Sequence, residues 1–230
     1  VSQPIIPVSP ALVFIIPEVE DIKVRTQEMT SHVNFEQGKS VIKREVADND
    51  HELDRIYEFT SAVLSNEDAR ITSIKITGYA SPEASYSYND RLSAQRVESL
   101  RNNLEQQFGI SRDAFELSNV PEDWDSLRRW IAGSDIRFRN DLLDIIDTTP
   151  DPDARDGKIR ALDGGATYNM LLAEVYPELR RVDYAIDYTV VPFTVERGRA
   201  AILTEPHNMS LNEMFLVALS YPEQSAEYVK

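Results

Sequence analysis

The sequence predicts an α/β (α+β) protein in which strands and helices alternate in the order β, α, β, α, β, with a long helical insertion before the last strand. Three patterns indicate this class. Ile74 and Ile76 alternate with the polar residues of the run Ser73–Thr77, which Gly78 closes, and the distant run Val182–Val191 alternates in the same way. Period-two alternation is typical of strands that bury one face. Between these runs, apolar residues from Leu92 to Phe108 recur at helical spacing.

Length and composition limit the possible functions. The chain has 230 residues, of which 42% are hydrophobic, enough for one large domain or one domain with flanks. Its net charge of −15 repels phosphate groups, so we expect neither nucleic acid nor an anionic membrane surface as a partner. The absence of cysteine excludes disulfides and thiolate metal sites.

The first elements are a linker with an edge strand and then a helix. Prolines are frequent in Val1–Pro17, so we interpret residues 1–30 as a linker and edge-strand region. Val33 and Phe35 mark the best strand, which a turn at Gly38 follows. A helix is predicted over Asn49–Leu64, with Asn49 as a capping residue and an acidic residue three positions later.

The central stretch contains a strand, a polar loop and a helix. The strand ends at Gly78, the loop is predicted over Tyr79–Asp90, and the helix ends at Phe108 before a capping Gly109. A loop that leads from a strand to a helix N-terminus can receive an anion, because backbone donors and the helix dipole converge there. We expect Asn89 to order this loop, since asparagine side chains commonly bond to nearby backbone.

This central stretch resembles the signature of the OmpA-like C-terminal domains, which Pal and MotB share. The signature is G-[YH]-T-D … Y-N-x-x-L-S-x-x-R-A, and the matching residues are Gly78, Tyr79, Tyr88, Asn89, Leu92, Ser93 and Arg96. A second match is Arg180-Arg181-Val182, similar to the N-R-R-V that introduces the last strand of the family. The resemblance implies a mixed sheet with helices on one face, within a domain spanning residues 31–193.

The resemblance also implies a ligand, the diaminopimelate of peptidoglycan stem peptides. In the family an arginine meets the carboxylate of this zwitterion and an aspartate meets its ammonium group. Arg96 falls on the arginine position, but Ser81 falls on the aspartate position and carries no charge. Glu83, two residues on, is a candidate replacement. The predicted ligand-binding residues are Ser81, Glu83, Asn89, Arg96 and Arg181.

Two functions follow from the resemblance. In the first, the domain anchors a periplasmic or outer-membrane-associated protein of a Gram-negative bacterium to peptidoglycan through loop 79–90 and Arg96. In the second, loss of the aspartate charge at Ser81 leaves a scaffold that assembles other envelope proteins at the outer membrane. The chain begins at Val1 without methionine, which fits the removal of a signal peptide or an upstream domain. No apolar run reaches the ~18 residues of a membrane-spanning helix.

After a short strand at Phe115–Asn119, the chain departs from the family pattern with an insertion of about residues 120–178. Helices are predicted in it over Pro121–Ala132, Asn140–Asp147 and Thr167–Val175. The acidic run 147–157 fails the ligand spacing of a calcium loop, because Asp156 stands where glycine is needed. We therefore expect a solvated, flexible loop there.

The C-terminal segment 194–230 is predicted to begin with a polar stretch and to continue as a helix over Leu211–Leu219. Ser210 and Glu213 have the spacing of a capping box for that helix. A second helix is expected from Glu223, which would make either the start of a TPR-like repeat or a packed C-terminal helix.

An enzymatic function is not expected. The three histidines do not have metal-ligand spacing, and the chain has no cysteine nucleophile, phosphate-binding glycine loop or elbow serine. We therefore predict a non-catalytic binding protein without cofactor or metal.

Overall fold

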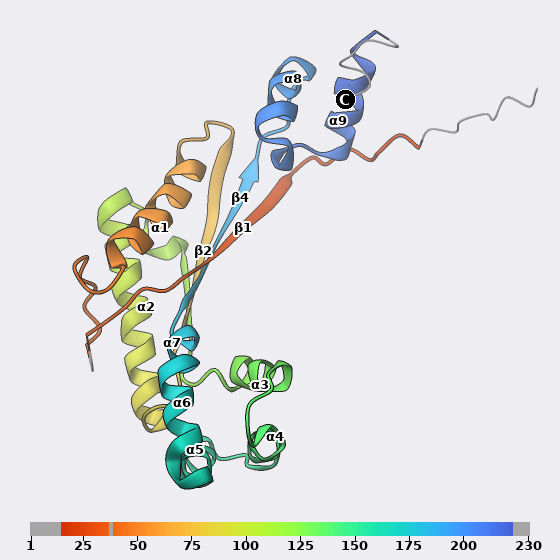
Figure 1. Ribbon diagram of the computed structural model, residues 1–230. Coiled ribbons are helices and arrows are strands. Elements are labelled where there is room, and N and C mark those ends of the chain that lie inside the picture. The colour runs from red at the N-terminus through yellow and green to blue at the C-terminus, as the bar shows by residue number, and fades with distance from the viewer. Residues whose placement is uncertain (1–14, 37–38, 223–230) are drawn as a thin grey trace, which may run out of the picture. The chain divides into compact units, whose positions relative to one another are not determined.

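The computed structural model describes residues 15–36 and 39–222. Four strands form one mixed sheet in the order β1-β4-β2-β3 (Figure 1). Their bounds are Lys23–Ser31 for β1, Ala69–Tyr79 for β2, Phe115–Val120 for β3 and Val182–Val190 for β4. Strands β2 and β3 are parallel, with Ile74 opposite Phe115 and Tyr79 opposite Val120. The predicted α/β class is confirmed.

The contacts divide the chain into two compact units. The main unit is Thr26–Thr189, and the terminal unit combines Val1–Arg25 with Val190–Lys230. Each is described by itself below.

Two long helices, α1 (Asn49–Leu64) and α2 (Tyr86–Phe108), lie along one face of the sheet (Figure 1). The sheet turns alternate side chains toward them. These apolar residues of the main-unit core are fully or almost fully buried: Leu53, Ile56, Ile74, Ile76, Val97, Leu100, Leu104, Val182, Tyr184, Ile186 and Tyr188. Gly78 is required here, because a Cβ at that position would overlap Cγ2 of Val97 on α2.

The insertion consists of five helices between β3 and β4. They are α3 (Trp124–Gly133), α4 (Arg139–Thr148), α5 (Pro152–Ala161), α6 (Ala166–Glu174) and α7 (Tyr176–Leu179). They share an apolar cluster of their own, which includes Leu127, Ile131, Leu142, Ile159 and Leu171. The three helices predicted in this region are confirmed, with small shifts of their ends.

The strand predicted around Val33 and Phe35 is wrong. Strand β1 ends at Ser31, and residues 32–36 are irregular. The side chain of Asn49 bonds to the backbone of Asn34, accepting from its N–H at 2.7 Å and donating to its carbonyl at 2.9 Å. The backbone groups that would pair with a strand therefore bond to α1. Asn49 performs this role within the first turn of α1 instead of capping it, because the N-cap is Asp48.

The flexible loop predicted over residues 147–157 is also wrong, because α5 begins at Pro152. Asp151 caps this helix by accepting a hydrogen bond from the N–H of Asp153 at 3.1 Å. A proline at the first helical position is typical of helix starts. The Asp151-Pro152 pair is a helix-start signal, but the sequence of the whole acidic run favours the interpretation of a solvated loop.

The terminal unit contains α8 (Val195–Thr204) and α9 (Leu211–Leu219). Helix α8 lies in the stretch described from the sequence only as polar, where Thr194 caps it by accepting from the N–H of Arg197 at 3.2 Å. The capping box of Ser210 and Glu213 is confirmed, as are the bounds of α9. The helix predicted from Glu223 lies outside the described residues.

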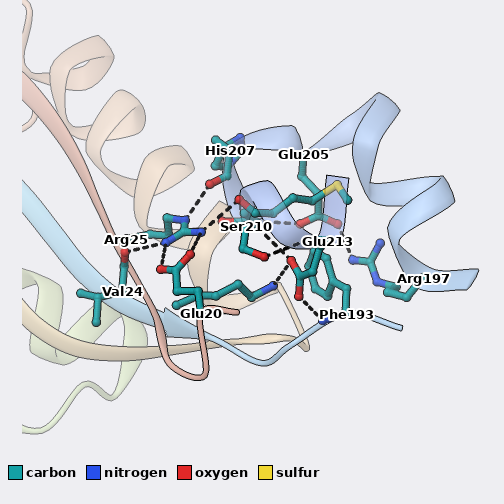
Figure 2. Close-up of polar contacts among 12 residues, drawn as sticks. Glu20, Val24, Arg25, Phe193, Arg197, Glu205, His207, Ser210 and Glu213 are labelled. Atoms are coloured by element: carbon teal, nitrogen blue, oxygen red, sulfur yellow. Dashed lines mark hydrogen bonds and ion pairs between the residues drawn. The ribbon is translucent and has the colours of Figure 1, made fainter. Parts of the chain in front are cut away.

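One carboxylate organises the polar contacts of the terminal unit (Figure 2). Glu213 accepts hydrogen bonds from the backbone N–H of Phe193 at 2.6 Å and of Ser210 at 2.9 Å. It also accepts from Nζ of Lys23 at 3.0 Å, and this ammonium lies 3.6 Å from the centre of the Phe193 ring. The Lys23 side chain is fully buried. Burial alone would raise the pKa of Glu213, but these donors together hold it below its usual value.

Candidate functional site: a polar cleft beside helix α2

The loop between β2 and α2 is shorter than predicted, because α2 begins at Tyr86. Ser85 is the N-cap residue but makes no side-chain cap. The cap comes from the insertion instead: Asp153 accepts a hydrogen bond from the N–H of Tyr86 at 2.8 Å. The insertion holds the loop at a second point, where Arg160 donates to the carbonyl of Glu83 at 2.8 Å. The N-terminus of α2 therefore already has an anionic partner.

Asn89 orders this loop, as the sequence suggests. It is buried in the first turn of α2, and its amide donates to the carbonyls of Ser81 at 3.4 Å and Ala84 at 3.3 Å. The same amide donates to Oε1 of Glu122 at 3.2 Å.

A cleft of about 460 Å³ opens beside this loop, within the main unit. Its walls include Val33, Phe35, Ser81, Glu83, Tyr88, Asn89, Leu92, Arg96 and Arg180. Four of the five predicted ligand residues thus line one cavity. Leu92, the first residue of the apolar spacing predicted for this helix, is only partly buried because it forms part of this wall.

One wall of the cleft holds a carboxylate with a cation. Oε1 of Glu83 accepts hydrogen bonds from Oγ of Ser81 at 2.7 Å and from Nε of Arg180 at 3.1 Å. Arg180 also donates to Oγ of Ser81 at 3.2 Å. Oε2 of Glu83 accepts no hydrogen bond from the residues that the structure describes. Oε2 of Glu83 can therefore accept a hydrogen bond from a ligand.

Arg96 enters the same cleft from α2 without a carboxylate partner. Its Nε donates to the carbonyl of Lys39 at 3.3 Å, and its guanidinium lies 4.7 Å from the centre of the Phe35 ring. Within residues 15–36 and 39–222, no carboxylate lies within 4.0 Å of it and its terminal nitrogens make no hydrogen bond. Burial and the nearby charge of Arg180 lower the pKa of Arg96. Among the described residues, the Arg96 guanidinium therefore forms no direct ion pair, although the charge of Glu83 acts on it across the cleft.

Arg181 does not line this cleft, and Arg180 stands in its place. Arg181 pairs with Asp123, lies 3.7 Å from Oδ1 of Asp183 and places its guanidinium 3.8 Å from the centre of the Tyr79 ring. These contacts fix the start of β4 against the end of β2. Arg180 lies before the start of β4 and is exposed, so the alternation of the strand does not distinguish it from Arg181 in the sequence.

Glu122 is a residue that sequence reasoning missed. It is 6% exposed and accepts hydrogen bonds from Asn89 and, at 2.8 Å, from Nε1 of Trp124. Burial raises its pKa above the usual value for a glutamate. Through Asn89 it supports the loop that forms the cleft, although it does not line the cavity itself.

Two further observations concern metals and membranes. Among the described residues, Asp48, His51 and Glu52 place ligand atoms within 4.8 Å of one another, but Glu52 already bonds Oγ of Ser31 at 2.5 Å and the N–H of His32 at 3.1 Å. No helix in the described part of the chain is long and apolar enough to cross a membrane.

The main unit is an α/β domain with a cleft lined by charged residues at the end of β2. Residues 34–121 match the model of the OmpA family, the family that the central stretch of the sequence resembles. The match covers α1, β2, α2 and β3. Domains of this family generally associate with peptidoglycan in the bacterial cell envelope and are typically non-catalytic. No curated protein matches the chain.

Proposed function

We propose that the cleft binds the diaminopimelate residue of a peptidoglycan stem peptide and so anchors a periplasmic or outer-membrane-associated protein of a Gram-negative bacterium to its cell wall. The observation that carries this proposal is that, among the described residues, a guanidinium without a carboxylate partner and a carboxylate with one free oxygen line the same cavity. Arg96 has free guanidinium donors, and Glu83 has a free carboxylate oxygen. A zwitterionic amino acid needs this combination.

Glu83 takes the part that an aspartate plays in the family. Ser81 supplies no charge but donates to Glu83, and Arg180 bonds the same oxygen. Because Arg180 partly neutralises Glu83, we expect the contact with the ligand ammonium to be weaker than the contact between Arg96 and the carboxylate. The main determinant of binding is then Arg96.

Calorimetric titration with a diaminopimelate-containing stem peptide tests the proposal. A charge-assisted hydrogen bond contributes about 1.5–3 kcal/mol, so Arg96→Gln should weaken binding by roughly tenfold or more. Arg112→Gln is the matched control, because Arg112 is an exposed arginine that does not line the cleft. A stem peptide with lysine in place of diaminopimelate lacks the carboxylate and should also bind at least about tenfold more weakly.

Equal binding by the parent and Arg96→Gln would contradict the proposal. Absence of heat at millimolar ligand would favour the second function, in which the fold is a scaffold for other envelope proteins and the partner-binding surface lies outside the cleft. Ser81, which leaves the family's anionic position uncharged, is the feature that favours this alternative.

A further inference from the structure

Helix α5 of the insertion holds the loop beside the cleft at two points. It lies next to the N-terminal end of α2 (Figure 1), where Asp153 accepts a hydrogen bond from the N–H of Tyr86 at 2.8 Å. Further along α5, Arg160 donates to the carbonyl of Glu83 at 2.8 Å. Residues 84–85 lie between the two contacts. The part of the loop that begins with a residue of the cleft wall is therefore tied to the insertion.

Arg160 is itself held in place from two sides. Its Nε donates to Oδ2 of Asp156 at 2.6 Å, and its guanidinium lies 4.5 Å from the centre of the Tyr168 ring on α6. A guanidinium can bind a carboxylate and a carbonyl at the same time, because its donors point in fixed directions. Asp156, Arg160 and the carbonyl of Glu83 thus form a chain of hydrogen bonds that leads from the insertion to the cleft.

The carboxyl group at the start of this chain is buried and only partly satisfied. Oδ1 of Asp156 has no hydrogen-bond partner among the described residues. Burial raises the pKa of Asp156, although Arg160 acts in the opposite direction. The charge of Asp156 therefore opposes folding at neutral pH. Besides Arg160, the ionisable groups that face it are Asp153 on α5, Glu83 on the loop, Glu122 at the start of the insertion, Tyr168 on α6 and Tyr176 on α7.

A second arginine–aspartate pair of the insertion provides a matched comparison. Nε of Arg128 donates to Oδ1 of Asp147 at 2.6 Å, the same distance as in the first pair. The Asp147 side chain is 44% exposed, however, against 12% for Asp156, and the bond from Arg128 lowers its pKa. In the described part of the chain, no hydrogen bond joins this second pair to the loop. Burial and the contact with the loop are what distinguish the first pair.

We propose that Arg160 and Asp156 are positioning residues of the cleft, which fix the backbone of Glu83 so that its carboxylate lines the same cavity as Arg96. The purpose of this positioning rests on the proposed function, but the ordering of the loop does not. As the pH falls, Asp156 takes up a proton and its bond with Arg160 loses the assistance of charge. The hold of α5 on the loop then weakens, so the insertion makes the geometry of the cleft sensitive to pH.

NMR relaxation of the backbone amides of residues 84–85 tests the positioning role without any ligand. The double variant Asp156→Asn/Arg160→Gln removes the contact with the loop and leaves no unpaired charge in the buried site. The order parameters of the two amides should fall from about 0.85, typical of rigid backbone, to about 0.6 or below. The matched control Asp147→Asn/Arg128→Gln should leave them unchanged. Unchanged order parameters in the first variant would overturn the proposal.

Asp156→Asn alone gives a readout that a purely structural role would not produce. Because the charge of Asp156 opposes folding, this substitution should leave the free energy of unfolding in urea unchanged or higher. It should nevertheless lower the order parameters of residues 84–85 at neutral pH. In the parent these order parameters should fall between about pH 7 and 4, and the fall should be smaller in the variant. A loss of stability without any change in loop order would contradict the positioning role.

Calorimetry with the stem peptide separates this inference from the proposed function. If the parent binds, the double variant should bind about fivefold more weakly, because fewer molecules hold the loop in the binding-competent position. Equal binding despite lower order parameters would overturn the positioning role. If the parent does not bind while the order parameters fall as expected, the proposed function fails and the hold of α5 on the loop is supported.

Discussion

The terminal unit and the cleft of the main unit both bring a glutamate together with cations, but they satisfy these charges to different degrees. In the terminal unit, each oxygen of Glu213 accepts a backbone N–H and the buried ammonium of Lys23 completes the set. In the cleft, Arg180 and Ser81 share one oxygen of Glu83, and Arg96 has no carboxylate partner among the described residues. A complete set of hydrogen bonds is typical of a structural contact, whereas free donors on a cavity are typical of a binding site.

The largest effect on stability should follow from removing one partner of Glu213. Lys23→Met leaves the Glu213 charge buried without its cation, and loss of one partner of a buried ion pair costs about 3–5 kcal/mol. The terminal unit should therefore unfold locally far more often. Hydrogen exchange of the α8 and α9 amides measures this change, because it reports the opening free energy of each segment.

Lys43→Met is the matched control for that substitution. Lys43 and Glu36 also lie 3.0 Å apart between Nζ and Oε1, but their side chains are 40% and 48% exposed. Exposed pairs contribute only about 0–1 kcal/mol. Similar losses of hydrogen-exchange protection in both variants would show that the buried pair contributes no more stability than the exposed pair.

A smaller effect should appear in the pH dependence of stability, to which Glu213 and Glu122 contribute with opposite signs. The lowered pKa of Glu213 contributes stability that is present above its usual value of 4.5 and is lost as the pH falls through the folded pKa. The raised pKa of Glu122 acts in reverse: stability is gained as the pH falls from its raised value toward 4.5. Protection factors of α9 and α3 amides between about pH 7 and 3 should therefore change in different directions on account of these two groups.

Other carboxyl groups titrate in the same pH range. The difference between the parent and a Glu→Gln variant therefore isolates the contribution of that one glutamate. Subtracting the profile of Glu213→Gln from that of the parent should leave a loss of stability below pH 4.5, and the subtraction for Glu122→Gln should leave a gain. The same sign for both differences would contradict the distinction between the two sites.

The sequence predicted elements whose signals are local. Helix α1 has the predicted bounds Asn49–Leu64, and α9 has both its predicted bounds and its capping box. Strands β2, β3 and β4 also follow from alternation alone. In the cleft, Ser81, Asn89 and Arg96 were found from their fixed offsets in the motif, and Glu83 was found as the acidic residue nearest the uncharged Ser81.

The parts that were missed depend on contacts between distant residues. Helix α2 begins early because Asp153, 67 positions away, caps Tyr86. Val33 is buried outside any strand because a side chain of α1 bonds to the adjacent backbone. Arg180 reaches the cleft from the residues just before β4, and Glu122 supports the cleft from the start of the insertion through its bond with Asn89. No pattern within a short window of sequence records such contacts.

The smallest effect on stability should come from the residue with the largest proposed effect on binding. Arg96 is partly buried, makes one hydrogen bond at 3.3 Å and contacts the Phe35 ring. Arg96→Gln removes a cation–π contact of about 0.5–1 kcal/mol and also relieves the proximity of two guanidinium groups, so the free energy of unfolding should change by less than about 1 kcal/mol. Urea denaturation followed by circular dichroism measures it. A loss of about 3 kcal/mol, as expected for Lys23→Met, would show that Arg96 supports the fold and that reduced binding in this variant has a structural cause. A small change in the free energy of unfolding combined with a large loss of stem-peptide binding would show that Arg96 acts in ligand binding and contributes little to the stability of the fold.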